Sequence, residues 1–432
     1  MHTLLALFLI AVCMLAIWQA VRSPTPLHVF SAVVGLFSIA YYGVPTVLIE
    51  RSTLRYLPEN ELIAMISMAL IYLLAVLLGI TVFQARFKAL PGVRMRLIDH
   101  YLETHWWKGT IASNLIVFLY SFNRVQTFYQ TDSVENFVDS QSSIAGFLGF
   151  FILLIQGLTG VYLARAIADR DKRRMVVAAA GIVIQTAMVI TAGQRLIFIT
   201  PALLFFAALV AQRSYREAGS ALVIAVVALV AISPFAVALR YGAWNGTQDV
   251  VAESFTYGEN PIDTMLQSIV DRADILETMT ALKAHVDANG HVGPIYYYSV
   301  LVVPVPRFLY RSKPAILSGD GSRGGEASVL VWRLLMGPSL GSLTAFGSII
   351  AYREGGWLWV PINGFLAGMM YSLLLTTFAR GGIVAHAFFG IAFFRWAVAK
   401  VSPSLMEMMV DVMTYLPVIL VFLIINRLLE GQ

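Results

Sequence analysis

Long runs of apolar residues recur along the chain, and polar residues are concentrated in the shorter stretches between them. A helix needs about 20 predominantly apolar residues to cross the hydrocarbon core of a bilayer. Eleven runs approach that length: Thr3–Val21, Leu27–Ile49, Glu61–Gln84, Trp106–Phe122, Ser143–Ala164, Met175–Ala192, Leu196–Ala211, Ser220–Leu239, Trp357–Thr377, Ile383–Val398 and Met408–Ile425. The pattern predicts an all-α polytopic membrane protein with about eleven transmembrane helices.

Composition supports this class. Only 13% of the 432 residues are charged and 58% are hydrophobic, whereas soluble domains carry about 25% charge. These values exclude a soluble globular enzyme and a disordered protein. The net charge of +5 comes from short cationic clusters between apolar runs, which is typical of membrane topology and excludes a nucleic-acid partner. Cys13 is the single cysteine, so no intrachain disulfide or cysteine metal cluster can form.

The distribution of lysine and arginine predicts the orientation. One set of short connections carries fifteen of these residues and the alternate set carries six. Because cytoplasmic loops are enriched in cations, we expect the first set inside, the C-terminus inside and the N-terminus outside. The chain then divides into spans one to eight (1–239), an extracytoplasmic loop domain (240–356) and spans nine to eleven (357–432).

The predicted loop domain carries an amphipathic helix and a basic patch. Asn260-Pro261 begins a helical apolar repeat, and Asn289-Gly290 is a typical helix stop. Further on, Arg307, Arg311 and Lys313 fall within seven residues that contain no acid. Guanidinium groups match phosphate oxygens in two bonds at once, so this patch predicts a phosphate site, with bulk anionic headgroups as the alternative.

Two further arginines lie at the expected outer ends of spans. Arg195 belongs to a three-residue connection, and the span after it is short and contains Pro201. We expect Arg195 to be drawn below the membrane surface into a protein-lined recess, where it needs a partner or water; snorkelling to the headgroups is the alternative. Arg240 caps the outer end of the eighth span and is either an interface anchor or part of the same anion site.

Glu354 and His291 are the candidate general bases. Gly337–Tyr352 is only weakly apolar and is interpreted as a partly embedded connector that leads to Glu354 at the outer boundary. Partial burial raises a carboxylate's pKa toward neutrality, and histidine titrates near neutral pH unaided. A structural role is the alternative for both. We interpret His386 as a packed residue, and Gly364 and Gly368 as a pattern that allows close helix approach.

The layout resembles the Wzy-type bacterial O-antigen and exopolysaccharide repeat-unit polymerases, and within that group the length and composition resemble the xanthan-type exopolysaccharide polymerases. The resemblance rests on one large outer loop late in the chain and on three stretches: Thr191–Ile199 (TAGQRLIFI), Val305–Pro314 (VPRFLYRSKP) and Glu354–Gly368 (EGGWLWVPINGFLAG). No single stretch is diagnostic by itself.

The resemblance implies a lipid-linked-donor glycosyltransferase of the bacterial inner membrane, with its large loop in the periplasm. Such an enzyme joins polyprenyl-pyrophosphate-linked oligosaccharide repeat units at the outer leaflet. It uses no nucleotide sugar, no metal and no cofactor, and a chain-length regulator protein is a candidate partner. In this interpretation Arg195, Arg240, Arg307, Arg311 and Lys313 hold the pyrophosphate, and Glu354 or His291 deprotonates the acceptor hydroxyl.

Three alternatives remain open. A glycan ligase would use the same anion site to move finished polymer to another acceptor. A transporter of polysaccharide or lipid-linked oligosaccharide would show internal repeats and charges near the midplane, which the sequence does not suggest. A structural scaffold gives no reason for the clustered arginines.

Overall fold

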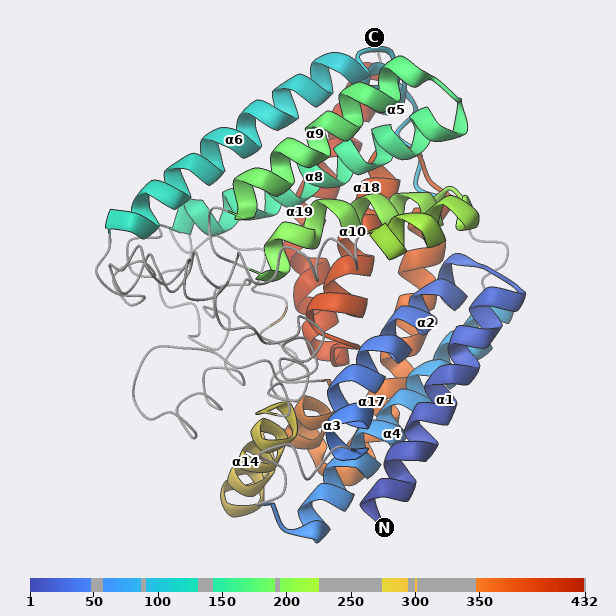
Figure 1. Ribbon diagram of the computed structural model, residues 1–432, viewed down its shortest axis with the longest axis vertical. Helices are drawn as coiled ribbons and strands as arrows, with labels where there is room; N and C mark the ends of the chain where they lie inside the picture. The colour runs from blue at the N-terminus through green and yellow to red at the C-terminus, as the bar shows by residue number, and fades with distance from the viewer. Residues whose placement is uncertain are drawn as a thin grey trace, which may run out of the picture. The chain divides into compact units, whose positions relative to one another are not determined.

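The computed structural model describes residues 1–47, 57–86, 91–130, 143–190, 195–224, 274–293, 300 and 347–430. All regular elements within these ranges are helices (Figure 1). The chain divides into two compact units. Unit 1 comprises Met1–Leu90, Leu266–Thr376 and Arg395–Gln432, and unit 2 comprises Pro91–Met265 and Thr377–Phe394.

Unit 1 is built on long helices from both ends of the chain. Its elements are α1 (His2–Arg22), α2 (Pro26–Ser38), the π-helical turn η1 (Ile39–Gly43), α3 (Val44–Val47), α4 (Glu59–Arg86), α14 (Asp274–Asn289), most of α17 (Gly347–Ala379), nearly all of η8 (Phe394–Ala399) and α19 (Leu405–Glu430).

Helices α4 and α17 of unit 1 approach each other at glycines. A Cβ on Gly364 would lie 2.8 Å from the Tyr72 carbonyl oxygen, and one on Gly368 would lie 2.2 Å from that of Val76. From the other side, a Cβ on Gly79 would lie 2.3 Å from the Phe365 carbonyl oxygen. The expectation that Gly364 and Gly368 allow close helix approach is therefore confirmed.

Unit 2 is a second helical bundle. It contains α5 (Arg96–Thr104), α6 (Trp106–Gln130), α8 (Ser143–Ala168), α9 (Lys172–Ile190), α10 (Arg195–Ala211) and α18 (Ile383–Phe393), and residues 215–224 are also helical. Asp99 joins two of these elements, because its Oδ2 accepts from the Met95 N–H and its Oδ1 from the Val384 N–H. His386 is buried in α18, and its Nε2 lies 3.3 Å from the Ala379 carbonyl oxygen, as expected of a packed residue.

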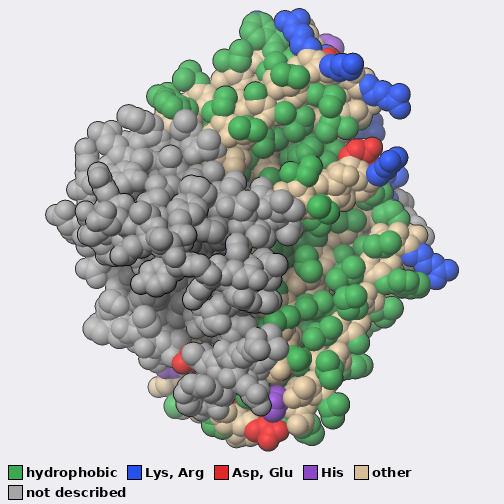
Figure 2. Space-filling view, in the orientation of Figure 1, with side chains coloured by type: hydrophobic (Ala, Val, Ile, Leu, Met, Phe, Trp, Pro, Cys, Tyr) green, Lys and Arg blue, Asp and Glu red, His purple; other side chains and the backbone are tan. Residues whose placement is uncertain are grey.

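In the part of the chain that the structure describes, five helical segments are long and apolar enough to cross a membrane: His2–Arg22, Pro26–Val47, Glu59–Gln84, Gly347–Ala379 and Leu405–Leu428. Large apolar side chains such as Leu4, Trp18 and Leu358 are exposed on them. On the face drawn in Figure 2, hydrophobic side chains cover much of the described surface, and the Lys and Arg side chains in view lie along its edge. The chain is therefore a helical membrane protein.

Ten of the eleven predicted apolar runs coincide with helices of the described chain. The eighth run, Ser220–Leu239, is described only as far as residue 224 and is helical there. The count of eleven spans and the extracytoplasmic placement of the loop domain stay predictions. One boundary differs: the connector expected to extend to Tyr352 is helical from Gly347 onward.

Candidate functional site

Helix α17 is broken at Gly355-Gly356. Gly355 has φ −159° and ψ 23°, and Gly356 has φ 72° and ψ −164°. A positive φ is readily adopted only by glycine. A Cβ on Gly356 would also lie 3.0 Å from Nε2 of His291, so both the backbone and the space favour glycine here.

The segment after α14 lies against this break. The N–H of Val292 donates to the Arg353 carbonyl and that of Gly293 to the Glu354 carbonyl, each at 3.0 Å. The last carbonyls before a helix end lack partners within the helix, and the segment supplies them. Gly290, with φ 86°, ends α14 at the predicted Asn289-Gly290 stop.

Glu354 carries a buried carboxylate at the break. Its residue is 4% exposed, and its Oε2 accepts from Trp359 Nε1 and Asn363 Nδ2, both at 2.9 Å. Residues nine apart are about 13 Å apart along an unbroken α-helix and point to opposite faces. The contact between Glu354 and Asn363 therefore exists only because the helix breaks between them.

Asn363 connects Glu354 to α19. Its side chain is fully buried, and its Oδ1 accepts from the Leu405 N–H at 2.9 Å. Leu405 is the first residue of α19, where backbone N–H groups lack partners within the helix. One amide thus holds the carboxylate with its donor group and the start of α19 with its acceptor oxygen.

A capping box completes the start of α19. The Glu407 Oε2 accepts from the Ser404 N–H at 3.0 Å, and the Ser404 hydroxyl accepts from the Glu407 N–H at 3.3 Å. Both residues are buried. This reciprocal pairing satisfies two backbone N–H groups and stabilises the first turn of α19, which contains the Leu405 N–H that Asn363 accepts from.

Asp411, one turn further along α19, binds two cations. Its Oδ1 lies 2.8 Å from the Arg395 guanidinium and 3.2 Å from Lys400 Nζ. Trp396 Nε1 donates to its Oδ2 at 3.0 Å. The Asp411 side chain is 3% exposed, and those of Arg395 and Lys400 are 18% and 16% exposed. A carboxylate that is this deeply buried in the protein needs such partners, because an unpaired buried charge would lower the free energy of unfolding.

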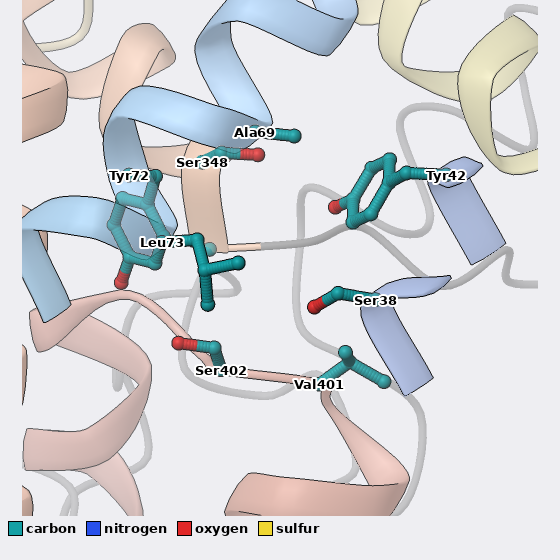
Figure 3. Close-up of a pocket in the computed structure, with 9 residues that line it drawn as sticks. Ser38, Tyr42, Ala69, Tyr72, Leu73, Ser348, Val401 and Ser402 are labelled. Carbon is teal, nitrogen blue, oxygen red and sulfur yellow. The ribbon is translucent and has the colours of Figure 1, made fainter. Parts of the chain in front are cut away.

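The turn between η8 and α19 is fastened by two tyrosines. The hydroxyls of Tyr72 in α4 and Tyr371 in α17 donate to the Pro403 carbonyl, at 2.8 Å and 2.9 Å. Beside this turn, Ser38, Tyr42, Tyr72, Ser348 and Ser402 line a cavity of about 10 Å³ (Figure 3). That volume suits one water molecule and no larger ligand.

A polar cluster on the surface of unit 1 attaches α14 to its neighbours. Lys283 Nζ lies 2.7 Å from Asp287 and 3.4 Å from Glu61 of α4, and the Tyr352 hydroxyl donates to Asp287. Partial burial opposes ionisation of Asp287, but the hydrogen bonds from Lys283 and Tyr352 outweigh it and lower its pKa. The hydrogen bond to Asp287 raises the pKa of Lys283. His291 packs edge-on against Tyr352, with ring centroids 5.4 Å apart.

The structure brings together the two predicted bases. Glu354 directly precedes the break and is buried, and His291 is exposed and lies against Gly356 of the break. Arg195 is the first residue of α10, in unit 2. Arg240, Arg307, Arg311 and Lys313 lie outside the described residues. The shared pyrophosphate pocket therefore stays a prediction.

Asn363, Glu407 and Asp411 were not among the predicted site residues. Two signals in the sequence could have indicated them. Ser404 and Glu407 have the spacing of a capping box, and Asp411 is an ionisable residue inside a predicted span. No signal indicated Asn363, because its partner Glu354 would face away from it in a continuous helix.

Chemically, the arrangement holds a fixed carboxylate inside a helical membrane protein, at a glycine break and beside an exposed histidine. It could act as a proton acceptor or as a site for a cationic or hydroxyl-bearing ligand. No protein-family model, curated protein or solved structure matches this chain.

Proposed function

We propose that the chain is a lipid-linked-donor glycosyltransferase that joins polyprenyl-pyrophosphate-linked oligosaccharide repeat units into exopolysaccharide or O-antigen. Its site would face the outer leaflet of the bacterial inner membrane. The observation that carries the proposal is Glu354, a carboxylate with 4% exposure inside an apolar helix and with two N–H donors on one oxygen. Ionisable groups at such positions are costly and usually serve function.

In the proposed reaction, Glu354 takes the proton of an acceptor sugar hydroxyl. The hydroxyl oxygen forms a bond to the anomeric carbon of the donor, and the bond from that carbon to the pyrophosphate oxygen breaks. The bonding electron pair leaves with the pyrophosphate, whose charge Arg195, Arg240, Arg307, Arg311 and Lys313 would stabilise. No nucleotide sugar takes part, which suits a site outside the cytoplasm.

The test uses the purified full chain in lipid nanodiscs with a fluorescent polyprenyl-pyrophosphate-linked repeat unit as both donor and acceptor. We expect a ladder of lengthened products. Glu354→Gln should lower the rate by about 10²–10⁴-fold, the range expected for loss of a general base. The matched control is Glu103→Gln, since Glu103 is 51% exposed and pairs only at the surface with Arg165. His291→Ala decides between the two candidate bases.

The outcomes of this assay distinguish the two candidate bases and distinguish a polymerase from a ligase. Normal elongation by Glu354→Gln together with loss in His291→Ala would transfer the role of base to His291. No elongation from the carrier-linked unit alone, but transfer to an added saccharide acceptor, would identify a ligase. A folded wild-type protein that does neither would overturn the glycosyltransferase proposal.

A transporter is the second candidate, because α17 is broken at Gly355-Gly356, directly before the predicted ninth span, and unit 1 also contains the buried ion pairs of Asp411. Broken helices with ionic groups form the substrate sites of many transporters. Proteoliposomes with a fluorescent lipid-linked saccharide test this candidate. Movement of the intact lipid between leaflets without lengthening would favour transport, and lengthening without movement would exclude it.

A further inference from the structure

One end of the unit 2 bundle gathers the ends of several helices around α5. Near the end of α8, Nη1 of Arg165 lies 2.9 Å from Oε1 of Glu103 in α5. The guanidinium of Arg174, in the first turn of α9, lies 5.3 Å from the ring centroid of Trp106 at the start of α6. The end of α8 and the starts of α6 and α9 therefore lie beside α5 at the same end of this unit.

This end of unit 2 carries an excess of exposed cations. The segments 91–108 and 165–174 contain eight Lys and Arg residues and four acids. Six of these eight cations are exposed: Arg94, Arg96, Lys108, Arg170, Lys172 and Arg173. Two of the acids, Glu103 and Asp169, are also exposed, but each lies within 4.0 Å of an arginine that is itself partly buried. This end therefore presents a positively charged surface.

Exposed apolar stripes begin beside these cations and run along α6 and α9. The stripe on α6 consists of Trp107, Ile111, Leu115 and Leu119, spaced four residues apart. The stripe on α9 contains Val176, Val183 and Ile184. Gln185 of α9 donates to Asn114 of α6. Both residues lie further along their helices than the contact between Trp106 and Arg174, so α6 and α9 run in the same direction. Exposed apolar stripes on a helical membrane protein face lipid, so the cations lie where the hydrocarbon core ends.

Helix α5 has the properties of an interfacial helix. It has nine residues, which are too few to span a bilayer. Ile98 is buried, whereas Leu97 and Tyr101 are 37% and 61% exposed on another face. Trp107 follows at the start of α6 with 47% exposure, and Lys108 Nζ lies 5.5 Å from its ring centroid. Tyr and Trp are enriched at the boundary between hydrocarbon and headgroups, so this composition is typical of a helix at headgroup depth.

We propose that α5 and the six exposed cations around it form a binding surface for anionic phospholipids. The guanidinium and ammonium groups bind the headgroup phosphates, and Tyr101 and Trp107 pack against the upper parts of the acyl chains. Both cationic segments belong to the connections predicted to face the cytoplasm, and the cytoplasmic leaflet attracts such clusters. An acidic protein would match the charge but not the apolar stripes that begin beside it, so lipid is the favoured occupant. The inference does not depend on the proposed glycosyltransferase function.

The test measures phospholipid binding to the purified full chain in detergent by native mass spectrometry. Phosphatidylglycerol is the anionic probe, and phosphatidylcholine with the same acyl chains is the probe without net charge. We expect phosphatidylglycerol to bind at least tenfold more tightly, and the difference to shrink as the salt concentration rises, because salt screens exposed charges. Equal affinities for the two lipids would overturn the proposal.

The decisive variant combines Arg96→Gln with Arg173→Gln. One cation near an anionic membrane surface raises affinity about fivefold, so the loss of two should weaken phosphatidylglycerol binding by at least tenfold. The matched control combines Arg22→Gln with Arg427→Gln, which removes the same charge from exposed positions in unit 1. We expect the affinity of the control to stay within threefold of wild type. An equal loss in both variants would show attraction by net charge alone and would overturn the proposed surface.

Tyr101→Ser distinguishes a lipid from an acidic protein partner. The change removes an aromatic ring but no charge, so we expect phosphatidylglycerol binding to weaken about threefold to tenfold and binding of soluble polyglutamate to stay unchanged. Unchanged phosphatidylglycerol binding in this variant would overturn the lipid assignment. Polyglutamate that binds the wild type more tightly than phosphatidylglycerol would also overturn it and would indicate an acidic protein partner. All the substituted side chains are exposed, so each variant should keep the wild-type thermal midpoint, which separates lost binding from lost folding.

Discussion

Among the described residues, the acidic side chains with an exposure of 9% or less all lie in unit 1. In unit 1, Glu354, Glu407 and Asp411 are 9% exposed or less, and each receives N–H donors or cations from neighbouring segments. In unit 2, Glu103 and Asp169 are 51% and 58% exposed and pair with arginines at the surface. The polar contacts described inside unit 2 include a neutral network, in which Gln185 donates to Asn114 and Thr159.

This contrast favours unit 1 as the location of the proposed general base. Buried charges lose their hydration and persist only where partners compensate them, so they are rarely retained without a use. Exposed ion pairs contribute little to stability and serve orientation and solubility instead. The following predictions test the contrast, starting with the largest expected effect.

Asp411→Asn should destabilise the protein most. The change leaves Arg395 and Lys400 without the carboxylate that both now contact. Removing one partner of a buried ion pair costs about 3–5 kcal/mol. The measurement is the free energy of unfolding in mixed micelles with increasing SDS. Asp169→Asn in unit 2 is the control, and its effect should stay within about 0.5 kcal/mol. Equal losses of unfolding free energy in Asp411→Asn and Asp169→Asn would contradict the proposed difference between the buried carboxylates of unit 1 and the exposed ones of unit 2.

Gly368→Ala should have an intermediate effect. The new Cβ would lie 2.2 Å from the Val76 carbonyl oxygen, so α4 and α17 must separate. Such overpacking costs about 1–3 kcal/mol. The control is Gly219→Ala, where no atom of the described residues lies within 4 Å of the new Cβ and alanine should be neutral or slightly stabilising. Thermal unfolding in detergent measures the stability of both variants. An unchanged thermal midpoint in Gly368→Ala would contradict the close approach of α4 and α17 at this glycine.

The Lys283–Asp287 pair should have the smallest effect and should depend on pH. The pKa of Asp287 is lowered from 3.8, so its contribution is full above that value and disappears as pH falls through the lower pKa of the folded state. The pKa of Lys283 is raised from 10.5, so its contribution disappears as pH rises through the raised pKa.

Because Asp287 is 42% exposed, we expect a coupling energy below about 1 kcal/mol. A double-mutant cycle with Lys283→Met and Asp287→Asn, measured by unfolding at several pH values and salt concentrations, gives this energy. A coupling that does not weaken at either pH extreme would contradict the assignment of charge to this pair.

Local patterns in the sequence predicted much of the fold. Asn289-Gly290 ends α14 because glycine accepts the positive φ of 86° that follows the helix. Leu276, Met279, Leu282 and Val286 repeat at helical spacing and are all buried. Each of these features depends on neighbours within one or two turns, which is the range over which periodicity is informative.

The candidate site was predictable only in part. Glu354 and His291 were identified by residue type, and their proximity was not foreseen because it requires the segment after α14 to pair with α17. The contacts of Glu354 with Trp359 and Asn363 depend on the break, which a pair of glycines allows but does not require. Helix α17 begins at Gly347 although the residues there are only weakly apolar, because tertiary packing outweighs that pattern.

The Pro403 carbonyl has a consequence for biogenesis. It accepts hydroxyl groups from Tyr72 and Tyr371, and the first of these lies 331 residues earlier in the chain. The ribosome synthesises the N-terminal segments first. The hydrogen bond of Tyr72 to Pro403 therefore cannot form until almost the whole polypeptide has been made and inserted. Truncation before Pro403 would remove the acceptor that both hydroxyls share. The N-terminal helices of the truncated protein would then lack this contact, and we expect quality-control proteases to degrade it.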